Sequence, residues 1–351
     1  MKIKINWLLI LQGWAMLWVV IGHSFLGIFK LGPTWETWLC DFAYSFHMPL
    51  FMLISGWLFY ITRLRAVDLN LSKGKDNRPS IRDNSLDLGK EKKWNCWAIV
   101  NDKAIRLLLP GLVFSIVALL LKIAFPGEMT RQVGLSINEV AHSYLYPYDN
   151  PMRELWFIVT LFAFFLFTPL WKWLVKNKWL EWGGIVALLV LHFFHPETTL
   201  LCIDRICRFA IWFYLGLVIS KENLVDECLA KKPWLTIIIG VIIYVIGRYT
   251  DPFITTFGGI VFSFGLAILL DKYIPKTFFS FRNYTYQIFL MGIFAQMFVK
   301  IMFKHISMPY VAAYIICILM GLYVPVLVSK LIEKINWKPL SLCVGLKPIK
   351  K

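Results

Sequence analysis

The sequence predicts an all-α protein: a polytopic transmembrane helical bundle of about ten spans, with both termini cytoplasmic. Three observations lead to this fold class. The 351 residues are 58% hydrophobic and 17% aromatic, with a mean hydropathy of +0.64, whereas soluble domains are about 45–50% apolar. Apolar stretches near the length of a bilayer crossing recur along the whole chain. The charged residues lie mainly between those stretches.

The ten predicted spans follow from the spacing of these apolar stretches. A helix needs about 20 apolar residues to cross a bilayer, and we place the spans at residues 6–28, 38–61, 105–125, 154–174, 181–195, 205–220, 234–249, 253–270, 285–303 and 309–330. The fifth and sixth spans are short. Pro49, Pro169 and Pro325 fall within spans, where proline can kink a helix. An even number of spans places both termini on one side of the membrane.

The basic residues orient the bundle. The chain has 37 Lys and Arg against 21 Asp and Glu, a net charge of +16. With both termini inside, about three quarters of the Lys and Arg lie on cytoplasmic segments, as the positive-inside rule requires. The positive charge therefore indicates membrane topology and no nucleic-acid partner. We expect a multi-pass protein of the inner (plasma) membrane, in contact with membrane lipid.

The polar segments define the remaining organisation. Residues 1–332 are predicted to form one transmembrane domain, within which residues 63–104 form a largely unstructured cytoplasmic loop rich in Lys, Asn, Asp and Ser. The charge of this loop either anchors the topology or attracts an anionic cytosolic donor. Residues 126–151 form the longest outer loop, and residues 333–351 form a basic cytoplasmic tail. The seven cysteines lack metal-ligand spacing, so no metal site is predicted.

Two histidines carry the strongest functional signal. His23 lies late in the first span and His47 early in the second. Because consecutive spans run in opposite directions, both should lie in the outer half of the membrane. An ionisable residue at membrane depth is costly and usually faces a protein interior or a wet cavity. Histidine is also the usual general base near neutral pH. The sequence thus predicts one shared polar site, with purely structural histidines as the alternative.

Other charged residues open spans at the same outer face. Arg153 and Glu154 begin the fourth span, Asp41 lies at the outer start of the second, and Arg205 and Arg208 begin the sixth on one helix face. A ring of cations around two histidines could bind an oxyanion or a carboxylate. The alternative is that these charges only mark the membrane–water interface.

Gln12 is the polar companion of His23 within the first span. The two are 11 residues apart, which is almost three helical turns, so they share a face and lie about 16 Å apart along the axis. Gln12 lies toward the cytosol and His23 toward the outside. A transmembrane group transfer needs such a polar stripe between the two sides.

Four segments resemble the acyltransferase-3 family of integral membrane acyltransferases, especially its sugar O-acetylase branch. Residues 11–23, LQGWAMLWVVIGH, are similar to the family's first-helix motif, and residues 46–59, FHMPLFMLISGWLF, are the closest stretch. Residues 103–110, KAIRLLLP, resemble the basic start of its third helix, and residues 155–162, LWFIVTLF, its aromatic fourth-helix signature. The order of these segments also agrees, so the resemblance covers nearly the whole chain.

The resemblance implies transfer of an acyl group, usually acetyl, from cytosolic acetyl-CoA to a hydroxyl of a glycan or lipid-linked sugar, as in O-acetylation of polysaccharides. His23 would then be the general base or an acyl-accepting nucleophile. His47 would orient or stabilise, with Glu154 or Asp41 as the histidine's carboxylate partner.

The same resemblance suggests two groups of binding residues. Gln12, Lys103 and Arg106 would lie on the donor side, where Lys103 and Arg106 suit the phosphates of coenzyme A. The outer arginines would hold acceptor charge or the developing oxyanion; these are Arg153, Arg205 and Arg208.

Two departures from the family pattern leave other functions open. Gln12 stands where the family most often has a basic residue, and Met291 where a late helix often ends in histidine. A transporter of a glycan or lipid intermediate and a non-catalytic partner of a polysaccharide-synthesis complex are the two alternatives. Acyl release from labelled acetyl-CoA would separate an enzyme from both.

Overall fold

The computed structural model describes residues 6–27, 32–64, 96–125 and 136–346, and every element in these ranges is helical. The α-helices are α1 (Asn6–His23), α2 (Thr34–Phe59), α4 (Cys96–Lys103), α5 (Leu109–Ala124), α6 (Ile137–Leu145), α7 (Leu155–Leu166), α8 (Thr168–Leu174), α9 (Lys178–Phe193), α10 (Ile203–Lys221), α11 (Pro233–Tyr249), α12 (Pro252–Tyr273), α13 (Thr285–His305), α14 (Tyr310–Ile335) and α15 (Lys338–Cys343). Single π-helical turns follow α2 (Tyr60–Leu64) and α4 (Ala104–Leu108), and another lies at Val225–Leu229. Short 3-10 turns lie at Pro147–Asp149, Leu200–Cys202 and Arg282–Tyr284.

The membrane character of the fold is clear from its helices: within the described residues, six helical segments are long and apolar enough to cross a bilayer. A seventh results if α7 and α8 form one span, bent by 58°. Pro169 lies in the first turn of α8, where the missing N–H and the fixed backbone angle favour a break. The all-helical membrane fold class is therefore confirmed. Helices occupy all ten predicted stretches, but the number of spans and the orientation stay predictions.

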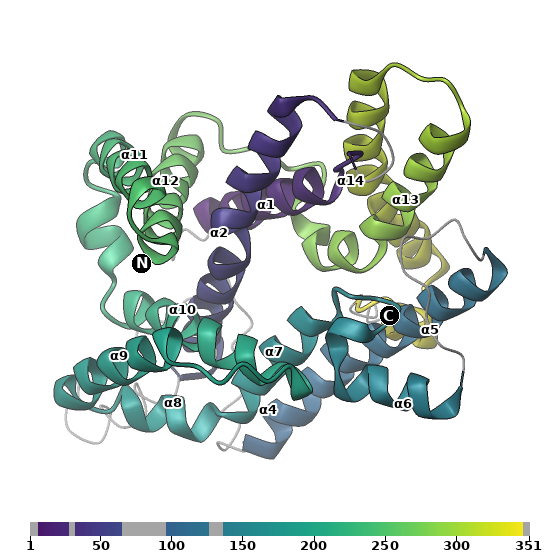
Figure 1. Ribbon diagram of the computed structural model, residues 1–351. Helices are drawn as coiled ribbons and strands as arrows, with labels where there is room; N and C mark the ends of the chain where they lie inside the picture. The colour runs from purple at the N-terminus through teal and green to yellow at the C-terminus, as the bar shows by residue number, and fades with distance from the viewer. Residues whose placement is uncertain (1–5, 28–31, 65–95, 126–135, 347–351) are drawn as a thin grey trace.

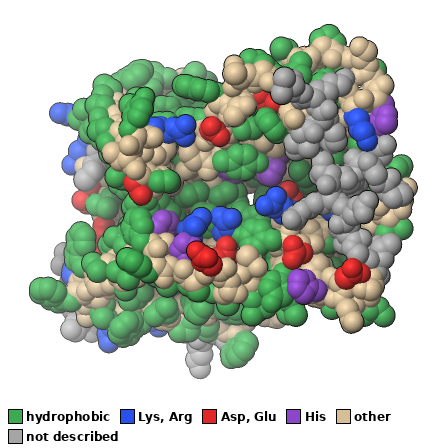
Figure 2. All heavy atoms as spheres, viewed as in Figure 1, with side chains coloured by type: hydrophobic (Ala, Val, Ile, Leu, Met, Phe, Trp, Pro, Cys, Tyr) green, Lys and Arg blue, Asp and Glu red, His purple; other side chains and the backbone are tan. Residues whose placement is uncertain are grey.

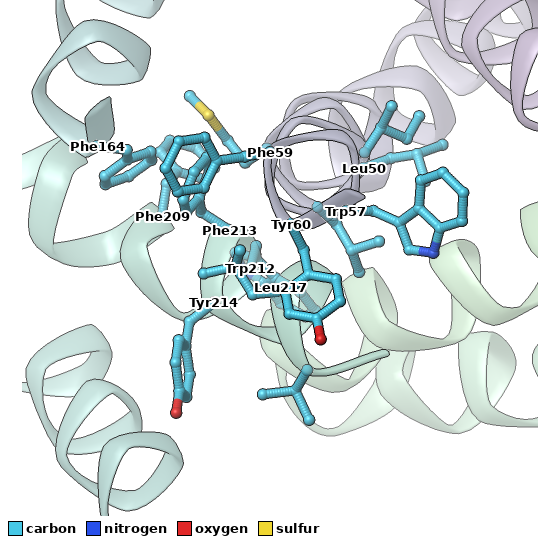
Figure 3. Packing of buried hydrophobic residues seen from close by; sticks show 14 of the residues in the cluster. Leu50, Trp57, Phe59, Tyr60, Phe164, Phe209, Trp212, Phe213, Tyr214 and Leu217 are labelled. Atoms are coloured by element: carbon cyan, nitrogen blue, oxygen red, sulfur yellow. The ribbon is translucent and has the colours of Figure 1, made fainter. Parts of the chain in front are cut away.

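Close crossing of α2 and α10 forms the centre of the bundle. Gly56 and Gly216 lie at this crossing, where an added Cβ would come within 1.9 Å and 2.0 Å of a backbone carbonyl oxygen of the other helix. Small residues allow membrane helices to approach this closely. In Figure 1, α2 runs between the α11–α12 and α13–α14 pairs toward α10. Figure 3 shows the aromatic side chains around the crossing, among them Phe59, Phe213 and Trp212.

Short helices occur in three segments that the sequence analysis treats as connections. Within residues 63–104, α4 covers Cys96–Lys103, while residues 65–95 lie outside the described part of the chain. In the predicted outer loop, α6 begins with a capping box formed by Ser136 and Glu139. In the tail, α15 is followed by a segment that docks on α13, because Gln287 donates hydrogen bonds to the carbonyls of Val344 and Gly345.

The bundle has two chemically different ends. At one end α1, α5, α9, α11 and α13 finish, and α2, α7, α10, α12 and α14 begin. At the other end, paired charges join neighbouring helices. There Lys221 of α10 contacts Glu181 of α9 at 2.5 Å, and Asp102 of α4 contacts Arg63 at 2.9 Å and Arg106 at 2.8 Å. The first end holds the cavity described next.

Candidate active site

A cavity of about 1620 Å³ opens at the first end of the bundle. On the face shown in Figure 2, Lys, Arg and His side chains gather around a central hollow between apolar surfaces. Seven residues singled out from the sequence line this cavity: His23, Asp41, His47, Arg153, Glu154, Arg205 and Arg208. The predicted meeting of the two histidines in one cavity is therefore present in the structure, while their chemical roles stay predictions.

His47 lies near the middle of α2, two residues before Pro49. Its side chain is 1% exposed, and its Nδ1 lies 2.5 Å from the carbonyl oxygen of Ala43. A carbonyl can only accept, so Nδ1 carries the proton and Nε2 is the basic nitrogen of the neutral ring. Pro49, two residues later, cannot bond the carbonyl of Ser45, which instead accepts from Thr256 of α12 at 2.7 Å.

His23 stands at the last residue of α1 and is only partly buried. It has a ring contact with Tyr44, whose centroid lies 6.0 Å away, and Tyr44 also contacts His47 at 5.2 Å. The described residues provide neither ring nitrogen of His23 with a hydrogen bond. Lys300 and Arg153 are the charged groups within electrostatic reach of its ring. Either nitrogen is thus available to a molecule in the cavity.

The carboxylates of the cavity do not act as hydrogen-bonded partners of the histidines. Glu154 is the residue before α7, yet its side chain makes no capping bond to that helix, so the carboxylate remains available to the cavity that it lines. Asp41 is exposed at the cavity wall. The group that orients His47 is instead a backbone carbonyl, that of Ala43.

Arg205 is held at the start of α10 by its neighbours. Its Nε donates to the hydroxyl of Tyr148, which in turn donates to Asp204 at 3.2 Å. Burial raises the pKa of Tyr148 to about 12, so this phenol keeps its proton and can serve as the donor to Asp204. Arg205 also contacts Asp204 directly at 3.4 Å. The guanidinium therefore has a fixed place in the cavity wall.

Arg208 is held by two histidines at the end of α9. Nη2 of Arg208 lies 3.1 Å from Nε2 of His195, which must act as the acceptor because a guanidinium only donates. Nδ1 of His195 donates to the carbonyl of His192 at 2.8 Å, and Nδ1 of His192 lies 2.6 Å from the carbonyl of Arg208. These two histidines were not predicted as site residues, although both lie near the outer end of a predicted span.

Lys300 is the most informative residue that the sequence analysis missed. It lies on α13, is 5% exposed and lines the cavity. A lysine within an apolar span is costly, and this was the signal available in the sequence. Lys122 and Arg248 also line the cavity. Among the described residues there is no group of three or more His, Cys, Asp or Glu that could hold a metal ion.

The three predicted donor-side residues lie away from the cavity. Gln12 is half-buried on α1. Arg106 pairs with Asp102, and Lys103 lies 4.3 Å from the ring centroid of Phe165, near the end of α7. Because Phe165 follows Glu154 by 11 residues, Lys103 lies about 16 Å along α7 from the cavity. The structure thus separates the two groups of predicted binding residues.

Comparison with known proteins identifies the family. Residues 5–330 match the model of the Acyl_transf_3 family, which is described as an acyltransferase domain. No curated protein and no solved structure matches the chain. The match covers nearly the whole chain and includes each of the four segments that resemble this family. The chain belongs to the acyltransferase-3 family and is a membrane acyltransferase.

Proposed function

We propose that the protein is an O-acyltransferase of the inner (plasma) membrane. It transfers an acetyl group from cytosolic acetyl-CoA to a hydroxyl of a glycan or lipid-linked sugar. The observation that carries this proposal is the cavity in which His23 and His47 meet beside fixed arginines. Paired bases beside cationic groups suit removal of a hydroxyl proton and stabilisation of the oxyanion that forms during acyl transfer.

In this proposal His23 acts either on the acceptor, as the base for its hydroxyl, or on the donor, as the nucleophile that takes the acetyl group; in both cases the C–S bond of acetyl-CoA breaks and coenzyme A leaves. Its ring nitrogens are open to the cavity, so it can take the hydroxyl proton or accept the acyl group. His47 has a fixed tautomer because Nδ1 donates to Ala43, and its Nε2 would accept a hydrogen bond from the acceptor and orient it. Arg153, Arg205 and Arg208 hold acceptor charge at the wall.

The donor would bind at the other end of the bundle. Lys103 and Arg106 offer positive charge to the phosphates of coenzyme A. Arg106 is half exposed and Asp102 already forms ion pairs with it and with Arg63, so a phosphate would be bound by a small charged cluster. The distance of about 16 Å along α7 requires the thioester arm to extend toward the cavity.

Acyl transfer by matched histidine variants tests the proposal. Full-length protein in membranes is incubated with labelled acetyl-CoA, and label in released acetate and in surface glycan is measured. His23→Ala should lower turnover by about 10²-fold or more, whereas His142→Ala, on α6 outside the cavity lining, should not. Undiminished transfer by His23→Ala at equal protein level would contradict the mechanism. Glycan movement without acyl release would favour the transporter.

Cysteine labelling tests the proposed orientation. In a chain without its native cysteines, a probe at Glu197 would report the cavity end and a probe at Lys276 the opposite end; both positions are exposed. An impermeant reagent added to intact cells should label Glu197→Cys alone. Labelling of Lys276→Cys alone would reverse the orientation.

A further inference from the structure

Among the residues that the structure describes, Lys300 differs from the other buried cations in having no ion-pair or hydrogen-bond partner. Its side chain is 5% exposed and forms part of the cavity wall. In the part of the chain that the structure describes, no carboxylate lies within ion-pair distance of Nζ and no hydrogen bond to it is found. Lys221, at the opposite end of the bundle, is also largely buried but contacts Glu181 at 2.5 Å and Glu222 at 3.6 Å.

In the described part of the chain, the carboxylates that act electrostatically on Lys300 form no ion pair with it. Glu36 is within electrostatic reach, but its two oxygens accept hydrogen bonds from the backbone N–H of Leu26 at 2.8 Å and from the hydroxyl of Tyr310 at 2.5 Å. Glu154 is also within reach but forms no ion pair. A buried ammonium without a counter-ion is strongly unfavourable. An anion in the cavity would supply the missing charge.

The cavity as a whole has an excess of positive charge. Its lining includes six basic side chains, Lys122, Arg153, Arg205, Arg208, Arg248 and Lys300, and three acidic ones, Asp41, Glu154 and Asp251. Arg205 and Arg208 already bond to Tyr148 and His195. Lys300 lines the same cavity from α13, together with Met297 and Ile301 of that helix.

We propose that Lys300 anchors an anionic acceptor, through a phosphate or carboxylate oxygen, within reach of His23. This inference rests on the proposed function and deepens it, because it names the acceptor class: a sugar that carries an acidic group or is linked to a lipid through phosphate. Lys300 is a positioning residue, since it holds the acceptor while the histidine reacts. A neutral acceptor would leave the ammonium uncompensated and would bind more weakly.

Binding without acyl donor tests this inference separately from catalysis. Thermal unfolding of the full-length chain in detergent is followed while a ligand is titrated. The probes are inorganic phosphate, a long-chain prenyl phosphate against its neutral prenol, and glucuronate against glucose. The variants are Lys300→Met, the charge-preserving Lys300→Arg, and Lys304→Met as a control at an exposed position one turn along α13.

The expected result is a stabilisation by an anion that its neutral counterpart does not give. The apparent affinity should fall at least tenfold in Lys300→Met and stay within about threefold in Lys300→Arg and Lys304→Met. Lys300→Met without ligand should melt at the same or a higher temperature than the unaltered protein, because an unpaired buried charge is lost. Stabilisation by prenyl phosphate and not by prenol would identify a lipid phosphate as the anion. Stabilisation by glucuronate and not by glucose would identify an acidic sugar.

Three results would overturn the inference: no anion stabilises the protein, the neutral counterpart stabilises it equally, or Lys300→Met binds the anion unchanged. A lower melting temperature of Lys300→Met without ligand, with anion binding lost equally in Lys300→Arg, would also overturn it by showing a structural role. None of these results depends on acetyl-CoA. They are therefore distinguishable from failure of the acyltransferase proposal, which is measured with His23→Ala.

Discussion

Replacing His47 with asparagine distinguishes the contributions of the two ring nitrogens of His47. The amide of asparagine reaches a position close to Nδ1, so His47→Asn can still donate to the carbonyl of Ala43, which His47 contacts at 2.5 Å. It has no counterpart of Nε2. His47→Ala loses both groups and also leaves a void, because the ring is 1% exposed. The two variants thus divide the contribution of His47 into structure and chemistry.

The expected magnitudes follow from these contacts. One neutral hydrogen bond contributes about 0.5–1.5 kcal/mol, so loss of the Nε2 interaction should lower turnover by about 2-fold to 13-fold if His47 only orients. His47→Asn should unfold within about 1 kcal/mol of the unaltered protein. His47→Ala should lose about 2–4 kcal/mol, as for other buried side chains truncated to alanine.

Initial rates of acetyl transfer and thermal unfolding, measured at equal protein, test these values. His23→Ala serves as the reference for loss of the reacting base, at about 10²-fold or more. A 10³-fold loss in His47→Asn with unchanged stability would refute the assignment and make His47 the base. Equal destabilisation in both variants would show that the bond to Ala43 does not hold the ring.

Three further predictions concern packing and positioning. Gly216→Ala should lower the free energy of unfolding by about 1–3 kcal/mol or more, because its Cβ would lie 2.0 Å from a carbonyl oxygen of α2; Gly183→Ala, with no atom within 4 Å, should melt like the unaltered protein. Glu36→Ala should lower the free energy of unfolding by about 3–5 kcal/mol in denaturant titrations, since two hydrogen bonds to a buried carboxylate are lost. An unchanged denaturation midpoint would contradict this. Tyr148→Phe should raise the KM for the acceptor severalfold with little change in kcat, because Arg205 loses its hydrogen-bond partner; an unchanged KM would show that Arg205 does not hold the acceptor.

The positions of the long helices could be predicted because an apolar stretch must form its backbone hydrogen bonds internally in a membrane. Pro169 also marked a real break, the bend between α7 and α8. The short helices were missed because they lie in polar segments, where apolar length says nothing. For α6 a readable signal existed, since Ser136 and Glu139 form a capping box at the spacing this motif requires.

Part of the site could be predicted because consecutive helices run in opposite directions. This topology brings the end of α1, with His23, next to the start of α2, with His47, whatever the details of packing. Contacts between distant segments could not be predicted in this way. The bond from Arg208 to His195 and that from Tyr148 to Asp204 depend on how α9, α10 and the segment before α7 meet. The sequence shows Lys300 as a charged residue within an apolar span, but only the structure shows that it lines the same cavity as His23 and His47.

The size of the cavity has a consequence for selectivity. Pockets that enclose a small ligand measure about 300–1,000 Å³, whereas this cavity measures about 1620 Å³. A single sugar ring would touch only part of such a wall, so its shape would discriminate weakly between related rings. Recognition of the acceptor would then depend mainly on the charged side chains of the cavity wall. Exchange of one wall cation would therefore change which acceptor binds more than exchange of an apolar side chain would.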